Sequence, residues 1–179
     1  KEGLITGPGL LESYNFMRWD GGVQQGSGTT VTYADFNIST CTTKVCLGRK
    51  LDMDGQVYWT GGNIEADASC ILDNAGDMEI ISQDIRSGVY CEGSLFNPNS
   101  SIPPEFRNGG RFLKSSLGAS RFGALFRNSG FINIAKGKFN FEAGGSFDGI
   151  LQTSGGAGAN FVGGSFFLGV TGQVRGTGS

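Results

Sequence analysis

A glycine-anchored motif that returns about every twenty residues constrains the fold of this chain more than any other feature. Phe-Arg-Asn-Gly-Gly at residues 106–110 returns as Phe-Arg-Asn-Ser-Gly at 126–130, a shift of 20. Gly-Gly-Ser-Phe at 144–147 returns at 163–166, a shift of 19. Repeats of this length are typical of solenoids, in which each repeat buries its apolar side chains by stacking on its neighbours. The chain is therefore expected to present a long surface.

Between the glycines, apolar and polar residues alternate. Phe-Ile-Asn-Ile at 131–134 and Lys-Phe-Asn-Phe at 138–141 both have a period of two, which is typical of half-buried strands. Only residues 10–18 have even a weak helical pattern, and they are interpreted as a cap. We predict an all-β fold, a parallel β-solenoid of about 20 residues per coil, which gives about nine coils.

Like residues one period apart are expected to stack along the solenoid axis. Stacked phenylalanines would form an internal ladder, and stacked asparagines would satisfy the amides of the turns. The expected core ladder consists of Phe106 with Phe126, Asn108 with Asn128, and Phe141 with Phe161.

The chain is expected to form one continuous body with two regions. Residues 1–50 are predicted to be irregular N-terminal coils or a cap, and residues 51–179 to be solenoid coils. A proline-containing loop is predicted at 97–105, because proline denies a backbone donor to a strand ladder. This loop would explain why Asn108 follows Asn74 by more than one period.

Charge divides the sequence into two halves. Residues 1–100 hold 13 acids and 6 bases, a net charge of −7, and residues 101–179 hold 3 acids and 8 bases, a net charge of +5. Opposite charges suit head-to-tail stacking, a heterologous contact that builds open filaments. The final residues still have the composition of a coil, so either the solenoid continues beyond residue 179 or this end meets another chain.

The four cysteines are Cys41, Cys46, Cys70 and Cys91. Cys91 follows Cys70 by close to one period, and adjacent coils are near enough for a disulfide. Cys41 and Cys46 can close a short loop. Three pairings of four cysteines exist, and four reduced, buried thiols are the alternative.

Two N-glycosylation sequons begin at Asn37 and Asn99. Together with an even number of cysteines they favour a secreted, extracellular protein of a eukaryote. The sequence has no uncharged apolar run of about 18 residues, so no membrane span is expected. Because it begins at Lys1 without a signal-like segment, we expect a mature chain.

Histidine is absent, which excludes Ser-His-Asp and Cys-His nucleophilic systems and histidine zinc sites. Asp77 and Glu79 would share one strand face and can serve glycoside hydrolysis, although a solvated acidic face is the simpler interpretation. Asp52-Met-Asp-Gly begins like a calcium loop, but Gln56 and Asn63 occupy the fifth and twelfth positions, so the match fails. No catalytic residue, metal or cofactor is predicted.

Trp59 follows Trp19 at a shift of 40, or two periods. The two tryptophans are interpreted either as core residues or as a strip on which sugars stack. The basic second half suits an anionic polysaccharide or an acidic protein; nucleic-acid binding would require a stronger positive charge and a recognisable module.

Residues 106–179 resemble the glycine-rich repeats of right-handed β-helix surface proteins: filamentous-haemagglutinin-like and autotransporter-like passengers and related repeat proteins of protists and algae. Phe-Arg-Asn-Ser-Gly-Phe-Ile-Asn-Ile at 126–134 carries the resemblance; residues 56–82 match more loosely and residues 1–50 poorly. The resemblance implies a right-handed parallel β-helix with an adhesive or structural role, and it carries over no catalytic residues. The cysteines and sequons indicate the eukaryotic branch.

These observations predict a secreted, non-enzymatic building block of an extracellular filament or surface layer that assembles head to tail. Its partners would be copies of itself or other filament subunits, and extracellular glycans are a further possibility. The alternatives are a carbohydrate-binding adhesin and a polysaccharide-cleaving enzyme on a β-helix.

Overall fold

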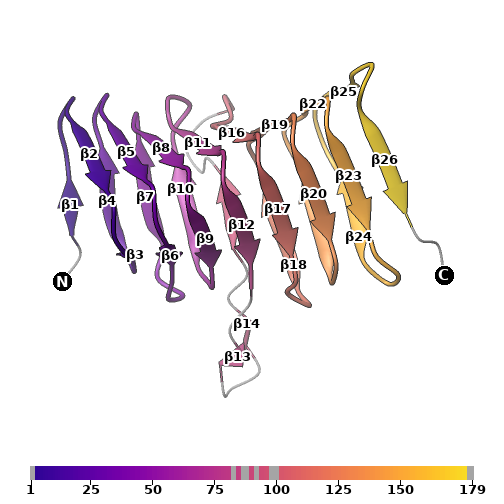
Figure 1. Ribbon diagram of the computed structural model, residues 1–179, viewed down its shortest axis with the longest axis horizontal. Helices are drawn as coiled ribbons and strands as arrows, with labels where there is room; N and C mark the ends of the chain where they lie inside the picture. The colour runs from indigo at the N-terminus through magenta and orange to yellow at the C-terminus, as the bar shows by residue number, and fades with distance from the viewer. Residues whose placement is uncertain (1–2, 82–83, 86–88, 91–92, 97–100, 177–179) are drawn as a thin grey trace.

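The protein forms a parallel β-solenoid, which confirms the predicted fold class (Figure 1). A computed structural model describes residues 3–81, 84–85, 89–90, 93–96 and 101–176. Within these residues every regular element is a strand, and three parallel sheets of eight strands each run the length of the body. The solenoid therefore has eight coils, one fewer than expected from the sequence.

Each coil contributes one strand to each sheet, in the order A, B, C. Sheet A contains β1 (Leu4–Ile5), β4 (Gly22–Gln25), β7 (Lys44–Leu47), β10 (Asn63–Ala66), β15 (Ser94–Phe96), β18 (Ala119–Phe122), β21 (Lys138–Phe141) and β24 (Gly158–Phe161). Sheet B contains β2 (Leu10–Ser13), β5 (Thr29–Thr32), β8 (Lys50–Met53), β11 (Ile71–Asn74), β16 (Glu105–Asn108), β19 (Leu125–Asn128), β22 (Gly145–Phe147) and β25 (Phe166–Leu168). Sheet C contains β3 (Met17–Trp19), β6 (Phe36–Ile38), β9 (Gln56–Trp59), β12 (Asp77–Ile80), β17 (Arg111–Lys114), β20 (Phe131–Ile134), β23 (Ile150–Thr153) and β26 (Gln173–Gly176).

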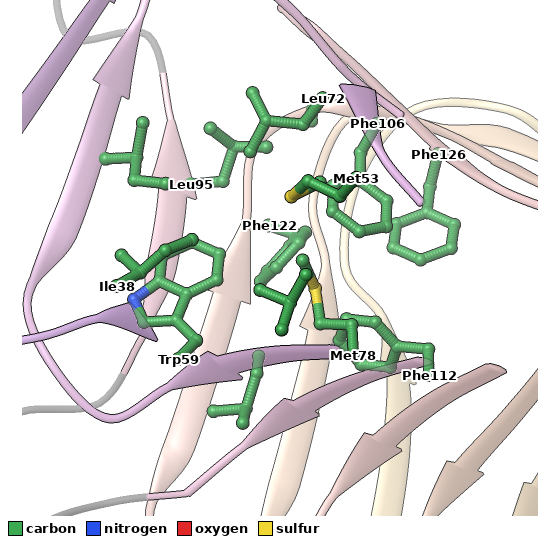
Figure 2. Close-up of a cluster of buried hydrophobic side chains, with 14 of the residues drawn as sticks. Ile38, Met53, Trp59, Leu72, Met78, Leu95, Phe106, Phe112, Phe122 and Phe126 are labelled. Atoms are coloured by element: carbon green, nitrogen blue, oxygen red, sulfur yellow. The ribbon is translucent and has the colours of Figure 1, made fainter. Parts of the chain in front are cut away.

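Successive side chains along each strand point alternately into and out of the coil, and the inward-pointing ones form the core. In β11, for example, Leu72 and Asn74 are buried while Ile71 and Asp73 are only half-buried. Phe106 from sheet B, Phe112 from sheet C and Phe122 from sheet A follow one another along the chain, and their rings meet edge to face (Figure 2). Aromatic rings bury large areas and favour such T-shaped contacts.

Phenylalanines also stack from coil to coil. Phe106 pairs in register with Phe126, with ring centroids 4.9 Å apart, and Phe141 pairs with Phe161 at 5.3 Å. By contrast, the repeat of 144–147 at 163–166 does not stack as its shift implies, because Gly145 pairs with Phe166 and not with Gly164. A slip of two residues keeps every side chain on its original side of the strand.

The N-terminal region is more regular than expected. β1 to β8 belong to the same three sheets as the later strands, and residues 10–18 form β2 and the start of β3 and contain no helix. The alternation there is hidden by polar inward-facing residues such as Gln24 and Thr30, both 1% exposed.

One coil is lengthened, but the proline-containing loop accounts for little of the extra length. β12 begins at Asp77 and β15 at Ser94, a shift of 17, whereas β9 begins at Gln56 and β10 at Asn63, a shift of 7. The ten added residues lie at the corner between sheets C and A, where β13 (Asp84–Ile85) and β14 (Val89–Tyr90) form an antiparallel pair that projects from the body (Figure 1). From β15 to β16 the excess over β10 to β11 is only three residues, a shift of 11 against one of 8.

The corner between sheets B and C contains a column of glycines. Gly76, Gly110, Gly130 and Gly149 follow one another on successive coils, and each lies against the backbone of the coil before it. A Cβ on Gly110 would lie 2.0 Å from the carbonyl oxygen of Gly76. The recurring glycine of the sequence is therefore required by the close approach of two backbones.

Candidate assembly faces at the two ends of the solenoid

The C-terminal end of the body exposes residues whose equivalents in the preceding coil are buried. Phe161, Leu168 and Val174 come from β24, β25 and β26, one from each sheet, and are 45%, 53% and 54% exposed. Their partners one coil earlier are at most 2% exposed; these are Phe141, Phe147 and Leu151. This face therefore lacks only a further coil to be covered.

The N-terminal end has the same architecture. β1, β2 and β3 are the first strands of sheets A, B and C, so each sheet has one edge at either end of the body. Leu11 points toward the core position occupied by Thr30 in the next coil, yet it is 37% exposed. Unpaired strand edges are templates for further strands unless they are covered.

An asparagine ladder runs along the inner side of sheet B. Asn74 Nδ2 donates to Asn108 Oδ1, and Asn108 Nδ2 donates to Asn128 Oδ1, both at 2.7 Å. Asn108 Nδ2 also lies 3.3 Å from the carbonyl oxygen of Gly110 at the glycine corner. The ladder ends in apolar residues, because Met53 precedes Asn74 and Phe147 follows Asn128 in register.

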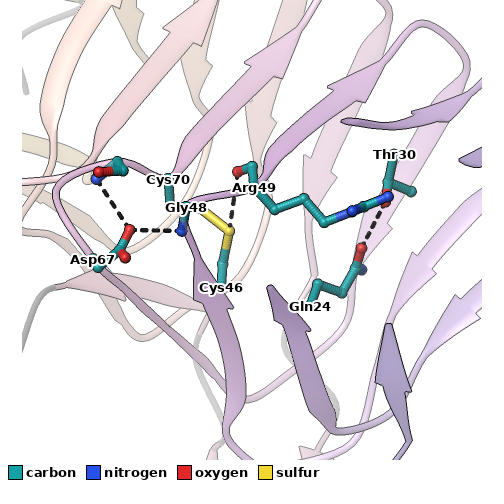
Figure 3. The surroundings of a disulfide bond; sticks show 8 residues. Gln24, Thr30, Cys46, Gly48, Arg49, Asp67 and Cys70 are labelled. Carbon is teal, nitrogen blue, oxygen red and sulfur yellow. Dashed lines mark hydrogen bonds between the residues drawn. A yellow bond between two sulfur atoms is a disulfide. The ribbon is translucent and has the colours of Figure 1, made fainter. Parts of the chain in front are cut away.

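Buried cations, which the sequence analysis did not identify, join the first coils. The Arg49 side chain donates to Thr30 Oγ1 at 2.8 Å (Figure 3). It also donates to the carbonyl oxygens of Gly7, Gly9 and Thr29. Thr30 in turn donates to Gln24 Oε1 at 2.8 Å. Arg49 thus connects three coils at the corner between sheets A and B. In the sequence, the only signal for this role of Arg49 is a basic residue between two strands, close to polar residues that face the core.

Lys44 is a second buried cation, at the corner between sheets C and A. Its ammonium group donates to the carbonyl oxygens of Thr40, Thr42 and Gly61 at 3.1, 2.9 and 3.2 Å. Burial lowers the pKa of Lys44 to about 8, although the nearby Asp20 carboxylate acts in the opposite direction. Desolvation disfavours the charged form of a lysine, and here it outweighs the attraction of the carboxylate.

We expect the free energy of unfolding to rise with pH between about 8 and about 10.5 through Lys44. Its pKa is lower in the folded chain than in the unfolded one, so the unfolded state binds more protons in this range. The Lys44→Met variant lacks this contribution, so the wild-type minus variant difference in unfolding free energy should increase with pH. Urea unfolding at several pH values measures it, and NMR titration of the Lys44 side chain should give a midpoint near 8. A midpoint above 10 would contradict the assignment.

Ion pairs cross the outer face of sheet B where the acidic and basic halves of the chain meet. Lys50 binds two carboxylates, at 2.8 Å to Asp52 and 3.1 Å to Asp73, and Glu105 binds two guanidinium groups. The hydrogen bond from Arg107 holds the pKa of Glu105 below its usual range. In register, two acids are followed by two bases: Asp52, Asp73, Arg107 and Arg127. The charge boundary is thus neutralised within the body.

The disulfide pairing differs from the contact that the period suggests. Cys46 is bonded to Cys70, with Cα atoms 6.0 Å apart (Figure 3). The insertion between β12 and β15 lengthens the coil that follows Cys70, so a shift of 21 residues does not correspond to one coil there. Cys41 is also disulfide-bonded, and Cys91 lies outside the described residues.

The tryptophans and the sequon asparagines are the next residues that the sequence analysis singled out. Trp19 and Trp59 occupy equivalent positions two coils apart on sheet C, with Ile38 between them in register. Both are buried, and Trp59 Nε1 donates to the Gly62 carbonyl oxygen at 2.8 Å. Neither ring can serve as a surface strip for sugars. Asn37 is half-buried on β6, and Asn99 lies outside the described residues.

Asp77 and Glu79 lie on the outer side of β12, and Glu79 accepts a hydrogen bond from Ser115. Polysaccharide cleavage by this pair stays a prediction. Among the described residues, no group of three or more metal-ligating side chains is found, and no helix suited to crossing a bilayer is present.

Comparison of the chain with protein-family models, with curated proteins and with solved structures finds no match in any of the three.

Proposed function

We propose that the protein is a secreted, non-enzymatic structural subunit that assembles head to tail into an extracellular filament or surface layer. The observation that carries the proposal is the matching order of strands at the two ends. β24, β25 and β26 end the same three sheets that β1, β2 and β3 begin. A second copy stacked on the C-terminal face would continue all three sheets in parallel.

Burial favours such a contact. The exposed Phe161, Leu168 and Val174 would become as buried as their partners one coil earlier, and fully burying a side chain of this kind contributes about 1.5–3 kcal/mol. The contact is heterologous, so it repeats without closing and builds an open filament.

The Cys46–Cys70 disulfide is compatible with an oxidising compartment outside the cell. The Asn37 and Asn99 sequons and the resemblance to surface proteins of protists and algae support the same location. Extracellular glycans are proposed as further partners.

Substitution of the C-terminal face tests the assembly. We expect the Leu168→Lys/Val174→Lys double variant to abolish filaments in negative-stain images while it keeps the unfolding midpoint of the wild type. A buried lysine without a partner opposes stacking, whereas both side chains are exposed in the single molecule. Leu117→Lys is the matched control, because Leu117 is 68% exposed but lies at a corner between β17 and β18.

Wild-type filaments should be observed at low salt. The part of their stability that comes from apolar burial should remain at high salt, since salt screens only the exposed charges. Dispersed wild-type monomers at low salt would refute the proposal. So would equal assembly by the wild type and the double variant.

A further inference from the structure

Two exposed tyrosines lie face to face at the corner between sheets B and C in the first two coils. Ser13 and Thr32 pair in register, so Tyr14 and Tyr33, which follow them, are neighbours on adjacent coils. Their ring centroids are 4.8 Å apart with an interplanar angle of 18°. Tyr14 is 66% exposed and Tyr33 is 43% exposed, so a reagent in solution reaches both rings.

One carboxylate accepts from both hydroxyls. Tyr14 and Tyr33 each donate to Glu12 Oε1 at 3.1 Å. These hydrogen bonds raise the pKa of both phenols, so the hydroxyls stay protonated at neutral pH. A phenol that is hydrogen-bonded to a carboxylate has a proton acceptor in place when it loses an electron.

We propose that Tyr14 and Tyr33 are a site of oxidative coupling, at which a peroxidase-class oxidant joins the two rings by a carbon–carbon bond. Each phenol loses one electron to the oxidant and one proton toward Glu12 or water. The two tyrosyl radicals couple at the ring carbons next to their hydroxyls, and the ring protons then move to the oxygens. In total, two tyrosines and one hydrogen peroxide give one dityrosine and two waters.

The position gives this bond a mechanical role. It would join the first coil to the second, and the first coil has a neighbour on only one side among the described residues. End coils of a solenoid open most readily, because each coil is stabilised by its neighbours. The proposal does not depend on head-to-tail assembly, since both rings belong to one chain.

Mass spectrometry after light-driven one-electron oxidation with a ruthenium complex and persulfate tests the site. Trypsin cleaves after Lys1, Arg18 and Lys44, so Tyr14 and Tyr33 fall in peptides 2–18 and 19–44. We expect a linked peptide two hydrogens lighter than the sum of these two, recovered from the monomer band after reduction of disulfides. Tyr14→Phe and Tyr33→Phe should each abolish it. Tyr58→Phe, which changes a half-buried tyrosine on β9, should leave it intact.

The same oxidation in urea is the control for geometry. The yield of the linked peptide should fall in urea, because the rings then separate, and Glu12→Gln should slow coupling severalfold in the folded protein. Oxidation of Tyr14 and Tyr33 without the linked peptide, or an equal yield in urea, would overturn the proposal. An unchanged rate in Glu12→Gln would overturn the part assigned to Glu12.

Discussion

Gly110→Ala should lower the free energy of unfolding by about 3 kcal/mol or more, the upper range for overpacking. The added Cβ would lie 2.0 Å from the Gly76 carbonyl oxygen and 2.4 Å from that of Ala75. Backbone cannot rotate away as a flexible side chain can. The Gly76 oxygen also accepts the hydrogen bond from the Arg111 amide at 2.9 Å, so displacing it disturbs the pairing of β12 with β17.

Gly109, the residue before Gly110, supplies the control substitution. A Cβ on Gly109 would meet its nearest atoms, Ser129 Oγ and the Asn74 carbonyl oxygen, at 3.8 and 3.9 Å, which is ordinary contact. Gly109→Ala is therefore expected to change the free energy of unfolding by no more than about 0.5 kcal/mol. Urea titration followed by the fluorescence of the buried Trp19 and Trp59 measures both variants. Equal unfolding free energies for the two would contradict the close approach of these coils.

Asn108→Asp should be the second severe substitution, with a loss of about 3 kcal/mol or more at neutral pH, because a buried hydrogen-bonded network is broken by a charge. The Asn108 amide nitrogen donates to Asn128 Oδ1 at 2.7 Å, and a carboxylate would place a second acceptor there. Asn108 is 1% exposed, so water does not compensate.

The pH dependence of the unfolding free energy of Asn108→Asp identifies the buried charge as the cause of its lower stability. Burial raises the pKa of the introduced carboxyl, so the folded variant binds a proton that the unfolded variant releases. A protonated carboxyl again donates to Asn128, and the difference from wild type should shrink as pH falls. Asn140→Asp is the matched control on the outer face. Its side-chain oxygen accepts from Asn160 at 2.8 Å, and a carboxylate still accepts, so we expect a change within about 0.5 kcal/mol.

The sequence predicted the features that repeat with the coil. Phe106, Asn108 and Gly110 recur because each must meet its equivalent in the next coil, and repetition makes such a requirement visible. Alternation within the strands then indicated the inner and outer faces.

Features that belong to a single coil were not predictable in this way. Cys46 and Cys70 are 24 residues apart, which is not the period of the motif, and the ten-residue insertion between β12 and β15 has no repeated signal. The Arg49 contacts reach two coils back, and no local pattern gives that range. The exposed ends of the body were anticipated only as uncapped ends, because their exposed Phe161 and Val174 have the same residue types as buried positions.

The β13–β14 excursion shows how such a body tolerates additional sequence. Asn63 still pairs with Ser94 and Asp77 with Arg111, so the ladder on either side of the excursion is undisturbed. A corner whose two ends are already fixed adds only a small closure entropy for each further residue. Foreign peptides grafted at this corner would therefore be carried on the scaffold without altering it, and the protein offers an attachment point for displaying epitopes or enzymes.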